Sequence, residues 1–328
     1  MFTRRNHKVA GAQERGETRN GFGREGVVDI QRARILTAMV EAVAEHGAAN
    51  VTVAHCVERA GISRRTFYEI FNDRDDCLLA AFDDAIERIA QRVVPVYERP
   101  SKWRERIRAS LIEFLSFLDD DPSTGRLVVV ETLGAGPRAL ERRGLVLAQI
   151  ISAVDGGRLE AKGGSEPPPL TAEGLAGAVL SVIHGRMVEG RTGRLIDLTG
   201  PLMSMIVLPY LGPAAARREL ARPVPTAPVH PRPVNGDPLR GLEMRLTYRT
   251  ICVLLAVAAS PGSSNRAIGG GAGITDQGQI SKLLARLQRL GLVENTGIGP
   301  ARGEPNAWTL TARGREVYGV IAEKTAAA

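Results

Sequence analysis

Hydrophobic residues recur at helical spacing through most of the chain, and this pattern predicts a mainly all-α fold. Residues 31–46 form the first predicted helix, which ends at Gly47 and carries five apolar residues on one stripe: Ile35, Leu36, Met39, Val40 and Val43. A short second helix, 53–60, follows Thr52 as its N-cap, and Gly61 supplies a sharp turn. Ser63 then caps a third helix. Asn72 or Asp73 caps a fourth.

The third predicted helix has one apolar face and one polar face. Phe67, Ile70 and Phe71 are spaced to pack inward together. Arg64, Arg65 and Tyr68 project the other way, with donors that suit phosphates and guanine edges. Helix, glycine turn and helix in this order predict a helix-turn-helix whose second helix enters the DNA major groove. An isolated helix with two arginines is more often a solvated surface, but the surrounding caps and turn favour DNA binding.

The same stretch resembles the N-terminal signature of TetR-type (TetR/AcrR) bacterial transcriptional regulators. The residues that carry the resemblance are Thr52-Val53, the run from Glu58 to Ser63, Thr66-Phe67-Tyr68, Phe71 and Arg74-Asp75-Asp76. The resemblance implies that Thr52 and Tyr68 hold phosphates, that Ser63, Arg64, Arg65 and Thr66 approach bases, and that Arg74 anchors the DNA backbone. Arg65 stands where the family often has Gly or Ala, and Cys56 and Cys77 stand where it usually has aliphatic residues.

The middle of the chain, to about residue 220, keeps the helical rhythm without strand alternation. A long buried helix is predicted near 103–118, and further helices at 127–133, 139–154, 175–188 and 202–211. By resemblance this is the ligand-binding and dimerisation domain, and its last two helices pair with those of a second subunit. The small residues in 174–181 allow such close packing, although they also occur in ordinary helix pairs. Homodimerisation implies a palindromic double-stranded DNA operator.

An effector pocket is a hypothesis for the same region, although apolar helices pack cores more often than they line pockets. The residues proposed to line it are Phe114, Phe117, Leu118, Val130, Leu133, Ile150, Ile183 and Met187. Glu131 and His184 interrupt apolar stretches and are interpreted as satisfied buried or rim groups rather than ligand contacts. The chemistry of the small-molecule effector does not follow from these residues.

A proline-rich stretch, 221–240, predicts an extended linker, and a second pattern follows it. Helices at 247–260 and 265–272, a third after Thr275 or Asp276, strands near 292–293 and 308–310, and a last helix after Thr311 resemble MarR-like winged-helix domains. The resemblance places Gln277, Gln279, Ser281 and Lys282 in a major groove and Arg302 at the wing tip. Three glycines, 269–271, are expected to weaken the second helix by about 1 kcal/mol each. Winged helices also serve as protein-interaction modules, which is the alternative role for residues 241–328.

The net charge of +7 favours an anionic partner, but the excess positive charge does not lie in the predicted DNA-binding head. Residues 29–80 carry six arginines against eight acids, a net of −2, so the head is not basic overall. Residues 1–28 carry six basic residues against three acids and are expected to form a disordered arm. The predicted domains are therefore 1–28, 29–80, 81–220, 221–240 and 241–328.

The sequence offers little sign of other chemistry. Cys56, Cys77 and Cys252 lack disulfide or zinc spacing, and no nucleophile or nucleotide motif is present, so neither an enzyme nor a cofactor or metal is expected. The longest clean apolar run, 251–259, is too short to cross a bilayer. The combined prediction is a cytoplasmic, ligand-responsive, homodimeric repressor with a second DNA-binding head. A single-headed regulator is the alternative.

Overall fold

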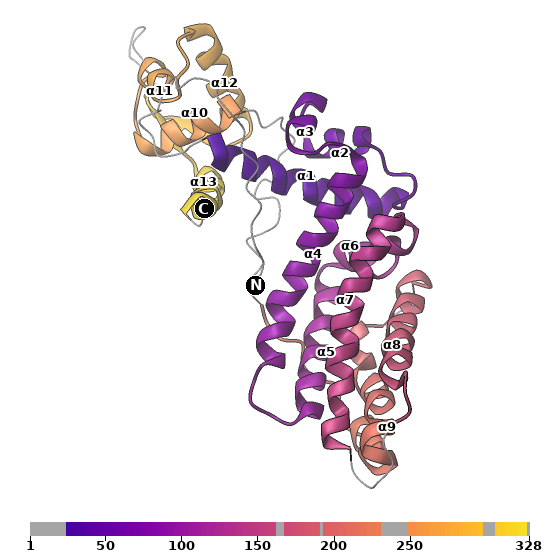
Figure 1. The fold of residues 1–328 in the computed structure, drawn as a ribbon. Helices are drawn as coiled ribbons and strands as arrows, with labels where there is room; N and C mark the ends of the chain where they lie inside the picture. The colour runs from indigo at the N-terminus through magenta and orange to yellow at the C-terminus, as the bar shows by residue number, and fades with distance from the viewer. Residues whose placement is uncertain (1–23, 162–166, 191–192, 231–247, 298–305, 327–328) are drawn as a thin grey trace. The chain divides into compact units, whose positions relative to one another are not determined.

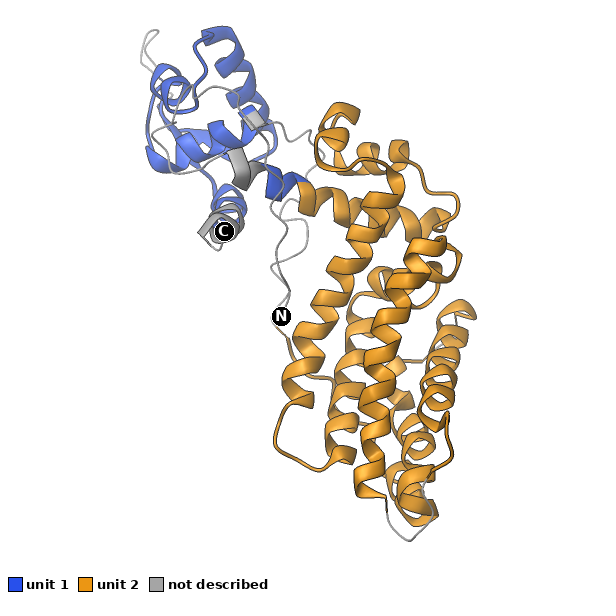
Figure 2. Ribbon diagram, viewed as in Figure 1, with its two compact units in different colours: residues 1–31, 246–328 blue, residues 32–245 orange. Residues whose placement is uncertain are grey.

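The structure, a computed structural model, describes residues 24–161, 167–190, 193–230, 248–297 and 306–326 (Figure 1). The chain divides into two compact units, one of residues 32–245 and one of residues 1–31 with 246–328 (Figure 2). The described residues are mainly helical, as the hydrophobic pattern predicted.

Four helices form the N-terminal head: α1 (Arg24–His46), α2 (Val53–Ala60), α3 (Arg64–Ile70) and α4 (Arg74–Tyr97). Helix α1 begins seven residues before the predicted start at 31, so the expected arm, 1–28, is helical from Arg24 onward. Ile30 is buried and extends the apolar stripe of α1 toward the N-terminus. The prediction missed this extension because charged residues precede Ile30 in the sequence. The predicted apolar residues of α1 all belong to one core cluster with Phe67, Phe71 and Leu78.

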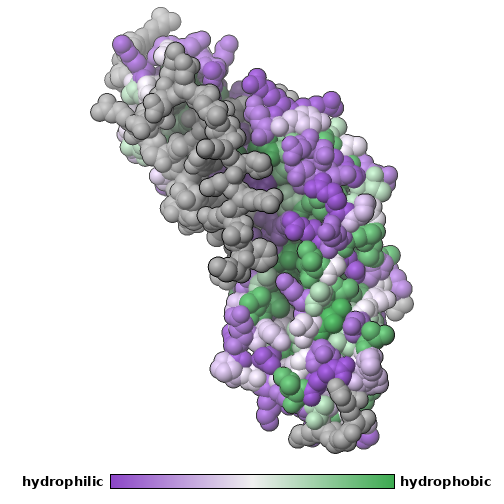
Figure 3. All heavy atoms as spheres, in the orientation of Figure 1, coloured by the Kyte–Doolittle hydropathy of each residue, from purple (hydrophilic) through white to green (hydrophobic). Residues whose placement is uncertain are grey.

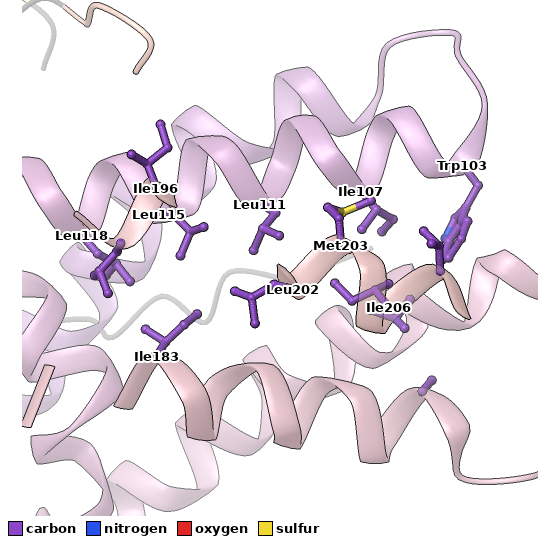
Figure 4. Close-up of a cluster of buried hydrophobic side chains, with 14 of the residues drawn as sticks. Trp103, Ile107, Leu111, Leu115, Leu118, Ile183, Ile196, Leu202, Met203 and Ile206 are labelled. Atoms are coloured by element: carbon purple, nitrogen blue, oxygen red, sulfur yellow. The ribbon is translucent and has the colours of Figure 1, made fainter. Parts of the chain in front are cut away.

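Helix α4 leads from this head into a helical bundle (Figure 1). The bundle contains α5 (Trp103–Asp120), α6 (Pro122–Val129), η1 (Glu131–Gly134), α7 (Pro137–Asp155), η2 (Gly156–Glu160), α8 (Thr171–Val188), η3 (Leu195–Leu198) and α9 (Thr199–Leu220). The apolar stripe of α5 faces α8 and α9, where Leu111 lies near Leu202 and Met203 (Figure 4). Trp103 and Tyr210 close one end of this core, with ring centroids 5.1 Å apart. A long buried helix was predicted here, and α5 confirms it.

Three consecutive aspartates end α5, and each stabilises a different neighbour. Asp119 accepts hydrogen bonds from the backbone N–H groups of Leu195 and Ile196, at 2.8 and 3.1 Å, at the start of η3. Asp120 pairs with Arg92 of α4. Asp121 caps α6 and accepts from Arg88 at 2.7 Å. The three aspartates therefore join the end of α5 to α4, α6 and η3.

The segment from Leu195 to Leu220 is long and apolar enough to cross a membrane by length and composition alone. In the structure 44% of its most apolar window is buried, and Ile206 and Val207 belong to the bundle core. Gly212 breaks the helix with a φ of 79°, so the segment is not one straight rod. These features are those of a core helix.

The second unit contains α10 (Tyr248–Ala259), α11 (Asn265–Gly271), α12 (Gln277–Arg289), strands β1 (Val293–Asn295) and β2 (Trp308–Leu310), and α13 (Ala312–Ala326). The strands pair antiparallel, with Val293 opposite Leu310. Helix α10 is buried around most of its surface because α11, α12, β2 and α13 all pack against it. The predicted order of elements agrees with the structure, with boundaries shifted by a few residues.

The glycines of α11 are not equivalent, which corrects the expectation that each one weakens the unit. Gly269 is buried, and a Cβ there would lie 2.9 Å from the carbonyl oxygen of Ile274. The same backbone approach brings the Ile274 N–H to the Gly269 carbonyl at 2.8 Å. Gly270 has open space around it. Gly269 is therefore required by packing, whereas Gly270 costs only helix propensity.

Candidate nucleic-acid interface

The turn between α2 and α3 is fixed by capping at both ends. Thr52 accepts a hydrogen bond from the His55 N–H and forms a capping box with it. Gly61 ends α2 in the left-handed region, with a φ of 62°, and its N–H bonds the Glu58 carbonyl. Ser63 begins α3 by accepting from the Thr66 N–H at 3.0 Å. Each capping residue was predicted from the sequence, and the structure confirms Thr52, Gly61 and Ser63 in these roles.

Helix α3 separates its apolar and polar faces as predicted. Phe67 is fully buried and lies 5.7 Å, between ring centroids, from the buried Phe71. Tyr68 meets Phe67 edge-on yet is 57% exposed, so its hydroxyl end is available to a partner. Arg64 is exposed and has no ion-pair or hydrogen-bond partner among the described residues. Within the described part of the chain, Arg65 pairs only with Glu69, across one helical turn at 2.9 Å.

The Arg65–Glu69 pair does not remove Arg65 from the candidate interface. Its two side chains are 89% and 54% exposed, and such exposed pairs contribute about 0–1 kcal/mol. A phosphate or guanine acceptor can therefore replace Glu69 at little cost. The polar face of α3 thus presents two available guanidinium groups and one phenol, with Ser63 and Thr66 beside them at the helix start.

Arg74 has a different setting from the other predicted contact residues. Its guanidinium donates to the carbonyl of Ala48 at 2.7 Å and to Asp75 at 2.6 Å, and its side chain is 27% exposed. In this arrangement it joins the start of α4 to the loop after α1. Its assignment to the DNA backbone stays a prediction. No sequence pattern marks the contact between Arg74 and Ala48, because it joins residues 26 positions apart through a backbone atom.

Glu131 confirms the interpretation as a satisfied group and adds a contact that was not predicted. Its carboxylate accepts from the backbone N–H of Ala48 at 3.0 Å and pairs with Arg126 at 2.9 Å. Leu127, one turn earlier in α6, is buried in the core cluster of the head. Helix α6 and η1 therefore support the loop between α1 and α2 directly.

The residues proposed for an effector pocket fall into three groups. Phe117, Leu118 and Ile183 are fully buried in the bundle core, and Phe114, Val130 and Met187 pack against that core. Leu133 and Ile150 are 47% and 37% exposed and lie outside it. Six of the eight residues are thus grouped in one apolar core, and two are on the surface.

The helices predicted to mediate dimerisation expose apolar and small residues. Helix α8 is apolar around most of its circumference, which is typical of a helix that is covered on all sides. Its Gly174, Gly177 and Ser181 are nevertheless exposed, and Val182 is 39% exposed. Leu208 of α9 is 47% exposed. Apolar patches interrupt the polar surface over the helical unit (Figure 3).

In the second unit, Gln277 and Lys282 are exposed on α12, Gln279 is half-buried, and Arg302 lies outside the described residues. Ser281 is exposed but donates to the Gln277 carbonyl and accepts from Asn265 at 3.0 Å. Asn265 also accepts from the indole N–H of Trp308 at 2.6 Å. Asn265, which the sequence did not single out, therefore joins α11, α12 and β2.

Neither cysteine of the head is available for chemistry. Burial raises the pKa of the Cys56 thiol to about 11, and burial raises that of Cys77 further. Both side chains are fully buried, so they fill core positions. No cluster of His, Cys, Asp or Glu that could hold a metal ion occurs among the described residues.

Comparison with known proteins identifies the N-terminal domain. Residues 35–81 match the family model described as "Bacterial regulatory proteins, tetR family". A curated relative, the HTH-type transcriptional activator FasR of Mycolicibacterium smegmatis (strain ATCC 700084 / mc(2)155), is 26% identical over 121 residues. That alignment covers 36% of this chain and 55% of the relative, so the match spans about half of FasR.

Solved structures of regulators also resemble the chain. FadR from Bacillus subtilis in complex with stearoyl-CoA has a TM-score of 0.47 at 18% identity, covering 53% of this chain and 96% of that one. A TetR family regulator from Marinobacter aquaeolei VT8 has a TM-score of 0.45 at 23% identity, covering 54% and 94%. The matching family and the curated relative are transcriptional regulators rather than enzymes.

Proposed function

We propose that this chain, whose N-terminal helices form a TetR-family helix-turn-helix domain, is a DNA-binding transcriptional regulator that reads its operator with α3. The single observation that supports this most strongly is the polar face of α3, where Arg64, Arg65 and Tyr68 are exposed opposite the buried Phe67. Arginine side chains of this kind contact phosphates and read guanine edges in the major groove. Since the head carries no net positive charge, binding depends on these few side chains and on duplication by a second subunit.

A gel-shift titration tests this proposal. Replacing Arg64, Arg65 and Tyr68 together by alanine is expected to weaken operator binding at least 100-fold, because each lost base or phosphate contact costs about 1–3 kcal/mol. A matched control replaces Arg99 and Arg138, two exposed arginines outside the head, and removes the same charge. Equal affinities for the triple variant and the control would refute the proposal.

The active form is proposed to be a homodimer joined through α8 and α9. Support comes from the exposed small and apolar residues of α8, which a second copy of the chain can cover. Val182→Arg places a charge in this surface and is expected to give monomers in size-exclusion chromatography with light scattering. Val94→Arg, at a position on α4 that is 44% exposed, is the control and should leave the mass unchanged. A dimeric Val182→Arg protein would exclude this interface.

We further propose repression that is relieved when a small molecule enters the apolar core between α5, α6 and α8. Phe117, Leu118 and Ile183 are fully buried members of that core. FasR is named an activator, so a promoter–reporter assay with and without the chain is needed to determine the sign of regulation. Reporter output that rises when the chain is expressed would replace repression by activation.

The second unit is proposed to be a winged-helix domain that contacts DNA beside the first head. Residues 246–328 carry nine Lys or Arg against five acids, a net of +4. Lys282 and Arg289 are exposed on α12, and the half-buried Arg286 lies one helical turn from each of them. Removing residues 246–328 should shorten the footprint and flatten the salt dependence of binding, because fewer phosphates are neutralised. An unchanged footprint and salt slope would favour the alternative role, a protein-interaction module.

A further inference from the structure

The first part of the predicted linker lies against the helical bundle. Among the described residues, polar contacts hold the two ends of residues 222–230 to the bundle, and an apolar contact holds the middle. At the start, Arg222 pairs with Glu105 of α5, at 3.3 Å, and with Glu219 at the end of α9, at 3.4 Å. Ala227 packs against the bundle core. The predicted linker residues from 231 to 240 lie outside the described part of the chain.

The last of the three contacts is the strongest candidate for a latch. His230 lies with its Nε2 2.6 Å from Oε2 of Glu113, in the middle of α5. The Glu113 side chain is 10% exposed and that of His230 is 27% exposed. Among the described residues His230 is the one hydrogen-bonding partner of this carboxylate. A carboxylate this deeply buried needs a partner, so the contact stabilises the strap and the helix together.

We propose that residues 222–230 form a docked strap, latched by His230 on Glu113, and that this latch sets the point from which the C-terminal unit is tethered. While the latch is closed, the tether starts after His230 and comprises residues 231–245, 15 residues. When it is open, Arg222 keeps its pairs with Glu105 and Glu219, so the tether starts after Arg222 and comprises 23 residues. The eight released residues add up to ~25 Å of reach at the rise of a proline-rich chain.

The latch thereby controls how far residues 246–328 can extend from the bundle. A longer tether allows a wider range of separations and lowers the effective concentration of one unit near the other, by about twofold if it falls as the −3/2 power of length. The effect of the latch on DNA binding rests on the proposed two-headed function. The docking of the strap on the bundle does not depend on that function.

Pulsed electron paramagnetic resonance, which measures the distance between two spin labels on the full chain, tests the latch. One spin label is placed at Val229→Cys, where the native side chain is 97% exposed, and the other at Ser101→Cys, also exposed. Cys252 is replaced by Ala, and the two buried cysteines of the head are left in place. The parent protein is expected to give one narrow distance distribution.

His230→Ala is expected at least to double the width of that distribution, whereas His230→Gln keeps an N–H donor for Glu113 and should retain the parent width. His184→Ala, which removes another half-buried histidine of the bundle, is the control and should also retain it. Glu113→Gln with His230→Ala removes the buried charge and should still give the broad distribution. A parent width in the two variants that carry His230→Ala would overturn the latch.

Footprints on DNA fragments that carry two half-sites at increasing spacing distinguish this proposal from the proposed function. Protection of both sites that extends to larger spacing in His230→Ala supports the latch and the second head together. A broadened distance distribution with a short footprint at every spacing supports the latch and refutes the DNA role of the second unit.

Discussion

The buried carboxylate of Glu219 should contribute more to the stability of the helical bundle than any exposed ion pair. Glu219 is at the end of α9 and is 1% exposed. It accepts from Arg108 at 2.8 Å, and it lies 3.4 Å from both Arg104 and Arg222. The perturbation is Glu219→Gln, which keeps the shape of the side chain and removes its charge.

The size of the effect follows from which partner is left without a counter-charge. The Arg108 side chain is 10% exposed, so its guanidinium stays buried when Glu219 is neutralised. Breaking one side of such a buried pair costs about 3–5 kcal/mol. Arg104 and Arg222 are 25% and 37% exposed and can turn to solvent or to Glu105, so each adds little. The expected loss in the free energy of unfolding is therefore ~3 kcal/mol.

Glu105→Gln is the matched control, because Glu105 contacts the same Arg104 and Arg222 but is 37% exposed. This change should cost about 1 kcal/mol or less. Urea unfolding is followed by the fluorescence of Trp103, which is fully buried in the bundle, in a Trp308→Phe background that removes the signal of the other unit. If Glu219→Gln lowers the free energy of unfolding no more than Glu105→Gln, the reasoning from burial is wrong.

Three further outcomes are expected. Gly269→Ala should destabilise the second unit in thermal unfolding, because its Cβ meets a backbone oxygen at 2.9 Å, whereas Gly270→Ala should stabilise it by up to about 1 kcal/mol; equal effects would contradict the packing argument. Burial alone would raise the pKa of Asp121, but hydrogen bonds from Arg88 and Thr124 outweigh it and hold the pKa below its ordinary value. The stability that this carboxylate contributes is therefore complete above about pH 4 and lost as the pH falls through the lowered pKa, and urea titrations of Asp121→Asn from pH 2 to 7 should lack that acid-side loss. In a thiol-modification assay on the folded chain, the half-buried Cys252 should react first, and the two buried cysteines of the head only at the rate of unfolding.

Local sequence patterns predicted the caps and helix faces of the head correctly. They did not predict contacts between residues far apart in the sequence. Thr52, Gly61 and Ser63 are recognisable because a capping residue and its partner lie within three or four positions of each other. The two faces of α3 follow from helical periodicity for the same reason. The Ala48–Glu131 contact joins residues 83 positions apart, and its donor is a backbone N–H that no side-chain pattern marks. Likewise, Leu133 and Ile150 fit an apolar helical pattern but lie on the surface. Helical periodicity predicts which residues share a face, but not whether another element covers that face.

The linker and the proposed pocket show the same limit. Proline content predicted an extended segment, and residues 222–230 make no regular structure, yet they are held to α5 by pairs such as His230–Glu113. The partners of that pair are 117 positions apart. Amino-acid composition predicts the conformation of a segment in isolation, but not which surface of the folded chain it packs against.

The predicted boundary at residue 80 is not a break in packing, and this determines how the head can be studied. Helix α4 runs through it from Arg74 to Tyr97. On the far side, Leu127 completes the core cluster of the head, and Glu131 pairs with the Ala48 N–H while Arg74 pairs with the Ala48 carbonyl. A fragment of residues 29–80 lacks Leu127 and Glu131, so a buried apolar contact and the partner of a backbone N–H are both lost. The loop between α1 and α2 is therefore positioned partly by the bundle, and the full chain, rather than an isolated head, is the correct object for measurements of DNA affinity.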